Sequence, residues 1–89
     1  MTNSIQAERI NSFSQIVLAN KVDKKSRVIA FDAVAWESQG RNYGAVQKGF
    51  LVDGEFVKFG SYQYPKIYPS FEAAAKSTYR IAKERIANL

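Results

Sequence analysis

The residues of this chain that could do chemistry are basic and aromatic side chains, which alternate along one stretch of sequence. Lysine and tyrosine share the stretch from Lys58 to Tyr68, with Tyr62, Tyr64 and Lys66 between its ends. Exposed aromatic rings stack on unpaired nucleobases, while neighbouring lysines hold phosphates. The pattern therefore indicates a nucleic-acid surface, although tyrosines packed at the rim of an ordinary sheet would give the same spacing.

Two further groups of basic residues extend this hypothesis. Lys24 and Lys25 lie in a polar, lysine-rich stretch, and a predicted helix carries three cations along one flank: Lys76, Arg80 and Lys83. The formal net charge of the chain is +5, and a basic domain attracts polyanions because each neutralised phosphate releases counterions. Solvated loops and outer helix faces also carry such residues, and Glu72 can pair with Lys76. Their placement in the fold therefore has to decide between the two interpretations.

The sequence contains no recognisable catalytic machinery. It has no cysteine and no histidine, which removes thiolate zinc ligands, the commonest metal ligand and the usual general base. Its serines lack the nucleophile-elbow pattern, and its glycines form no phosphate loop. We therefore expect a binding module and not an enzyme, with no catalytic residue, no metal site and no cofactor.

The length of the chain bounds its organisation. Eighty-nine residues fit one domain, residues 1–89, with a limited core. The sequence shows neither a secretory signal nor a stretch long enough to span a membrane. We expect a cytoplasmic protein, or a nuclear one if its source has a nucleus.

The elements that must position the candidate residues predict an α+β fold. Ile10, Phe13 and Val17 recur at spacings of three and four, which predicts an N-terminal helix over residues 4–20. Strands are predicted over residues 27–37, 43–52 and 55–62, and a C-terminal helix over residues 70–88. The expected architecture is an antiparallel sheet of three to four strands with the C-terminal helix packed on one face. Prolines at positions 65 and 69 restrict the segment before that helix to a sheet edge or a loop.

A tight hairpin at Asp53-Gly54 fixes the register of two predicted strands. Asp-Gly is favoured in the type I′ turn, because both central residues adopt positive φ. A two-residue loop places Lys48 opposite Phe59, and side chains then alternate between the faces. This alternation assigns Phe50, Val57 and Phe59 to the core, and Phe56, Lys58 and Tyr62 to the face available to a partner.

One family resemblance covers most of the chain. Val52-Asp53-Gly54-Glu55 looks like a tight turn between two strands, and Glu72-Ala73-Ala74-Ala75-Lys76 looks like part of an alanine-rich final helix. This arrangement resembles the double-stranded RNA-binding domain, whose order is α-β-β-β-α, and it implies sequence-independent binding of duplex RNA. The paired lysines with which that family grips phosphates would fall near Ser70 and Phe71, which are uncharged.

The leading interpretation is a small nucleic-acid-binding module that contacts phosphates with some aromatic stacking. RNA is favoured over DNA, and the candidate residues are Lys58, Tyr62, Tyr64, Lys66, Lys76, Arg80, Lys83, Lys24 and Lys25. The alternative is a protein-interaction or inhibitory module, for example a phage or accessory factor that blocks a host protein or an RNA–protein complex. The expected partner is thus nucleic acid or a protein, not a membrane, and the chain is compatible with a homodimer.

Overall fold

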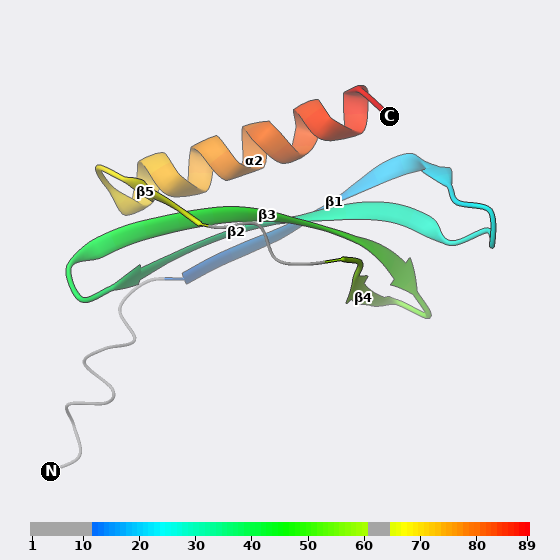
Figure 1. The fold of residues 1–89 in the computed structure, drawn as a ribbon, viewed down its shortest axis with the longest axis horizontal. Coiled ribbons are helices and arrows are strands. Elements are labelled where there is room, and N and C mark those ends of the chain that lie inside the picture. Colours follow the sequence, from blue (N-terminus) through cyan, green and yellow to red (C-terminus); the bar gives the residue numbers. More distant parts are fainter. Residues whose placement is uncertain (1–11, 61–64) are drawn as a thin grey trace, which may run out of the picture.

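A computed structural model describes residues 12–60 and 65–89. The elements follow in the order β1 (Ser12–Val22), β2 (Val28–Ser38), β3 (Arg41–Val52), β4 (Glu55–Lys58), β5 (Lys66–Tyr68) and α2 (Phe71–Ala87). The strands form one antiparallel sheet in the order β1-β2-β3-β4, and β5 pairs with β3 beside β4. The helix α2 lies across one face of this sheet (Figure 1).

The predicted N-terminal helix is wrong. Residues 12–20 belong to β1, whereas residues 4–11 lie outside the part of the chain that the structure describes. A separation of four residues, as between Phe13 and Val17, puts two side chains on the same face of a strand as well as of a helix. Ile16 and Val17 are β-branched and favour a strand. Pairing of residues 12–18 with β2 then decides the conformation, which periodicity alone left ambiguous.

The hairpin at Asp53-Gly54 is confirmed. Both turn residues have positive φ, 52° for Asp53 and 80° for Gly54. Val52 lies opposite Glu55 and the predicted register continues along both strands. The amide of Phe59 donates to the carbonyl oxygen of Lys48 at 2.9 Å, although β4 itself ends at Lys58 and not at the predicted residue 62.

The segment between the two prolines forms the short edge strand β5. Tyr68 lies opposite Asn42 and Lys66 lies opposite Gly44, so β5 pairs with the beginning of β3 while β4 pairs with its end. The sheet-edge alternative for this segment is therefore the right one.

The C-terminal helix is confirmed, with Ser70 as its N-cap. The Ser70 hydroxyl accepts a hydrogen bond from the amide of Ala73 at 3.0 Å. The helix buries Ala74, Thr78 and Ala82 against the sheet. Because these side chains are small, the helix axis can approach the strands closely.

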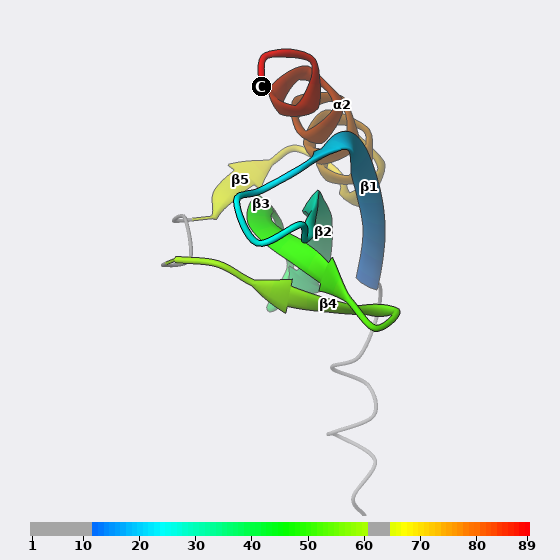
Figure 2. The same ribbon diagram turned by 90° about the vertical axis from the view of Figure 1, so that its right-hand side faces the viewer.

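The core lies between α2 and the middle of the sheet. Phe31, Ala33 and Val46 are buried there together with Ala82, and larger residues such as Phe13 pack around them. The helix packs mainly on β2, β3, β1 and β5. The end of β3 and the whole of β4 diverge from it, as Figures 1 and 2 show.

Candidate nucleic-acid interface

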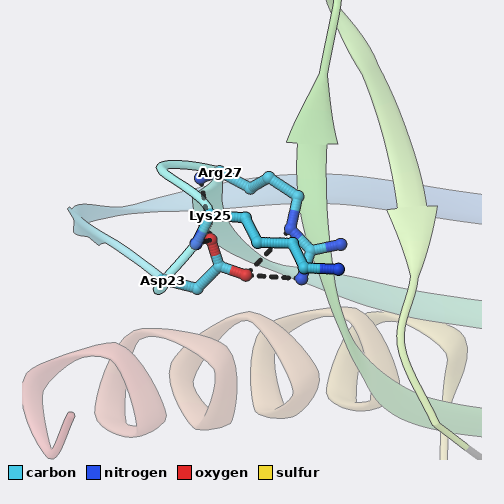
Figure 3. Close-up of polar contacts among 3 residues, drawn as sticks. All are labelled: Asp23, Lys25 and Arg27. Carbon is cyan, nitrogen blue, oxygen red and sulfur yellow. Dashed lines mark hydrogen bonds and ion pairs between the residues drawn. The ribbon is translucent and has the colours of Figure 1, made fainter.

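The loop between β1 and β2 is organised by Asp23. One carboxylate oxygen, Oδ1, accepts the amides of Lys25 at 3.0 Å and Arg27 at 2.8 Å, and Oδ2 accepts the Nε of Arg27 at 2.8 Å (Figure 3). The side-chain hydrogen bond from Arg27 is the largest cause that lowers the pKa of Asp23 to about 2. In the view of Figure 3, the side chains of Lys25 and Arg27 both extend from this loop in the same direction.

Arg27 begins a cluster of alternating cations and aromatic rings. Its guanidinium carbon lies 4.0 Å from the ring centroid of Phe50. The ring of Phe59 packs edge-to-face on Phe50, with centroids 5.3 Å apart, and the Lys48 ammonium lies 5.8 Å from the centroid of Phe59. We call Arg27, Lys48, Phe50 and Phe59 the basic–aromatic ledge.

Phe59 is the accessible ring of this ledge. Phe50 is 6% exposed, whereas Phe59 is 54% exposed. Phe50 contacts the ring of Phe59 with the two ring planes 70° apart, and the Lys48 ammonium over the Phe59 ring interacts favourably with its π-electrons. A planar aromatic or heteroaromatic group can therefore add to the ledge without rearrangement of the fold.

The predicted alternation of this hairpin is right, but the predicted burial of two of its side chains is wrong. Val57 is 49% exposed and Phe59 is 54% exposed, although both had been expected in the core. They do share a face with Phe50, but the helix that covers this face does not extend along β4 (Figures 1 and 2). On the opposite face, half-buried Phe56 packs over Gly49, where a Cβ would lie 2.5 Å from the ring.

A second cationic site lies at the other end of β3. Here α2 and β5 enclose a cleft of about 80 Å³ whose charged lining residues are Lys66 and Arg85. Gly44, Tyr68 and Thr78 also line it. Because about 10–15 Å³ of such volume is enough to hold a water molecule, the cleft has room for an oxyanion the size of phosphate. Its lining contains no carboxylate among the described residues.

The face of the sheet opposite α2 is less suited to a polyanion. Trp36 and Tyr43 stack there, with ring centroids 5.6 Å apart, and both are half-buried. The carboxylate of Asp32 lies on the same face and accepts a hydrogen bond from the Ser14 hydroxyl at 2.8 Å. An acidic side chain therefore lies within this face, where it disfavours the approach of a phosphate.

The residues predicted from the sequence fall at several separate places. Lys66 lines the cleft, and Lys24 and Lys25 are exposed in the β1–β2 loop next to Arg27. Lys58 is exposed on β4, but it lies opposite Gly49 and so on the other face from Phe59. Tyr62 and Tyr64 lie outside the described residues.

The helix cations have local partners. Lys76 pairs with Glu72 at 3.7 Å and Arg80 pairs with Glu84 at 3.1 Å, both across one helical turn. The ammonium of Lys83 lies 4.5 Å from the ring of Tyr79. The solvated-face interpretation of this helix therefore fits the structure better than a phosphate grip does.

Five residues that form the ledge or supply charge to the cleft were absent from the predicted set. They are Arg27, Lys48, Phe50, Phe59 and Arg85. The hairpin register already placed Lys48 opposite Phe59, so this pair could have been found from the sequence. The sequence did not reveal that α2 does not extend over β4. The absence of the helix there leaves this pair accessible.

The described residues contain no group of three His, Cys, Asp or Glu side chains that could hold a metal ion. Over the same residues, no helix is both long enough and apolar enough to cross a lipid bilayer. The described order β-β-β-β-β-α also departs from the order α-β-β-β-α of the double-stranded RNA-binding domain. Comparisons with protein-family models, with curated proteins and with solved structures find no match for this chain.

Proposed function

We propose that the protein binds single-stranded nucleic acid, RNA in preference to DNA, through the basic–aromatic ledge. The observation that carries this proposal is the ring of Phe59, which is 54% exposed, contacts Phe50 and is flanked by Lys48. Aromatic rings of this kind stack on unpaired bases, while adjacent cations contact the phosphates. Unpaired bases occur mainly in RNA loops, bulges and ends, which supports RNA as the target.

The charge near the ledge supports binding to phosphates. Lys24 and Lys25 lie in the adjoining loop, and Asp23 is already bound to Arg27. The chain as a whole carries a net charge of +5. Encounter with a polyanion would therefore be favoured over a distance of about a Debye length, roughly 8 Å at physiological salt.

The cleft at Lys66 and Arg85 would serve as a second contact on the same strand of nucleic acid. Gly44, which lines the cleft, and Lys48, which belongs to the ledge, are four residues apart on β3, a distance of about 13 Å along a strand. Both residues face the side of the sheet that carries α2. A segment of a few nucleotides could stack a base on Phe59 and place a phosphate at the cleft.

Fluorescence anisotropy with a labelled single-stranded RNA tests the ledge directly. Phe59→Ala should weaken binding roughly 5- to 150-fold, because stacking of a base on an aromatic ring is worth about 1–3 kcal/mol. Tyr79→Ala is the matched control, since Tyr79 is also a partly exposed ring beside a lysine but lies on the outer side of α2. Absence of binding to any RNA at low ionic strength, or equal losses in the two variants, would refute the proposal.

A protein-interaction or inhibitory module is the second candidate, because the same end of the molecule exposes apolar side chains. Val57 is 49% exposed and Val52 is 36% exposed, on the same face of the sheet as Phe59. Apolar and aromatic anchors of this kind are typical of protein interfaces. Lys48→Gln distinguishes the two functions, because it should weaken a phosphate contact but leave an apolar protein contact intact at high salt.

A further inference from the structure

β1 is the outermost strand of the sheet, and its far edge pairs with no described strand. A long edge strand presents a row of backbone N–H and C=O groups that pair with another strand unless charges, proline or a covering element prevent it. From Ser12 to Asn20 the strand has no charged residue and no proline. This edge therefore lacks the side chains that usually prevent pairing.

The backbone groups of β3 point alternately towards β4 and towards β2. The hydrogen bond from the amide of Phe59 to the carbonyl oxygen of Lys48 shows that the groups of the even-numbered residues point towards β4. The direction of these groups alternates along an antiparallel strand. Odd-numbered residues of β3 therefore bond to even-numbered residues of β2, and odd-numbered residues of β2 bond to odd-numbered residues of β1. The backbone groups that point outward from the sheet edge are those of Ser12, Ser14, Ile16 and Leu18.

We infer that β1 pairs with β1 of a second copy of this chain, antiparallel and around a two-fold axis, so that two sheets join into one. The regular part of β1 covers residues 12–18, because the register shifts between Leu18 and Val22. Pairing of this whole segment with itself centres the axis on Gln15. Ser12 then lies opposite Leu18 of the other copy, and Ser14 lies opposite Ile16. The backbone N–H and C=O groups that point outward in one copy therefore meet those that point outward in the other.

The uncharged edge of β1 allows a second copy to approach without local charge repulsion. Two molecules of net charge +5 repel one another over most of their surfaces. Along residues 12–18, however, the pairing places no charged residue against another. The symmetric arrangement also closes on itself, since each copy uses the same residues for the contact.

The side chains at this edge would extend the apolar packing of each sheet. Phe13 and Val17 pack against the core on the α2 side and are only partly buried. In the dimer, Phe13 of one copy lies opposite Val17 of the other. On the opposite face the pairing partly covers Leu18, which is 52% exposed in the single chain. Cross-strand pairs of aromatic and β-branched residues stabilise such a junction.

Sedimentation velocity of the full chain over a range of concentrations tests this inference. The wild-type chain should form dimers as its concentration rises. Gln15 is exposed in the single chain, so Gln15→Lys and Gln15→Glu should leave the fold intact while placing like charges opposite each other at the axis. Each variant should raise the dimer dissociation constant by roughly fivefold. An equal mixture of the two should recover dimers, because opposite charges then meet.

A matched control separates position from net charge. Ile67→Lys adds the same charge at a residue of β5 that is 59% exposed and distant from β1 in strand order, so dimer formation should be unchanged. A wild-type chain that stays monomeric at every concentration would overturn the inference. So would dimers that both Gln15 variants and their mixture form equally well. RNA binding is a separate measurement, since Phe59→Ala should leave the dimer unaffected.

Discussion

One face of the sheet has two ends that differ sharply in how they are packed. Under α2, small residues such as Ala33, Ala74 and Ala82 bring helix and sheet into close contact, and all three are fully buried. Beyond the helix, at the end of β3 and along β4, large apolar side chains such as Val57 and Phe59 remain half exposed. The same face therefore stabilises the fold at one end and offers a contact surface at the other.

The difference shows that residue size alone does not identify the core of this protein. The side chains that lie deepest are mostly alanines, and Ala33, Ala74 and Ala82 are buried where the helix packs on the sheet. Phe59, which is more exposed than Tyr79 on the helix, lies where the helix is absent. Substitutions at the two ends should therefore affect different properties, stability at the covered end and binding at the open end.

The largest expected effect on stability is at the covered end. Phe31→Ala should lower the free energy of unfolding by about 3–5 kcal/mol, because Phe31 is 4% exposed and its removal leaves a cavity. Phe59→Ala should lower the free energy of unfolding by less than about 1 kcal/mol, because about half of that side chain remains exposed to water in the folded protein. Urea denaturation measures both values. Similar losses would mean that the two ends are packed alike.

The close approach of the helix should be visible at Gly44. A Cβ at this position would lie 2.7 Å from Cγ2 of Thr78 and 2.9 Å from the ring of Tyr68. Gly44→Ala should therefore lower the free energy of unfolding by about 1–3 kcal/mol through overpacking. Thr78→Ser removes the nearest methyl group and should restore part of that loss in the double variant. Additive losses would show that the helix is not seated on Gly44.

At the open end, Lys48→Gln should reduce the salt dependence of RNA binding. Loss of one phosphate contact changes the slope of log K against log salt by about 0.7 for a single strand. Lys76→Gln is the control, because it changes the net charge by the same amount at a lysine that already pairs with Glu72. Anisotropy titrations between low and moderate salt give both slopes. Equal changes would indicate a diffuse electrostatic effect instead of a contact at the ledge.

The smallest effect is expected at the loop that carries Arg27. The pKa of Asp23 is lowered from 3.8 to about 2, so its carboxylate stabilises the folded loop above about pH 4 and loses that contribution as the pH falls towards 2. NMR of the Lys25 and Arg27 amides should show the loop opening over this range. In Asp23→Asn the amide oxygen still accepts the backbone bonds, but that pH dependence should vanish. An unchanged pH profile would assign the transition to another group.

The predictions from the sequence succeeded where the signal was local. The Asp-Gly pair specified the turn and hence the register of β3 with β4, and Ser70 specified the start of α2. The N-terminal segment failed for the opposite reason. The spacing of Phe13 and Val17 is compatible with a helix and with a strand, and pairing with a partner distant in sequence selected the strand.

The candidate site was only partly predictable for the same reason. Lys24, Lys25 and Lys66 were identified by composition and lie near the ledge or in the cleft. The ledge itself needs Arg27 from one hairpin to meet Phe50 and Phe59 from another. No pattern within either segment indicates that meeting.

The sequence by itself determined the turn, the helix cap, the alternation of faces and the basic charge, because each depends on neighbouring residues. Only the tertiary structure decided which part of a face is covered. A helix of fixed length, seated over β2 and the first part of β3, leaves β4 outside its reach. Phe59 is exposed for that reason, and not because of any property of the residues beside it in the chain.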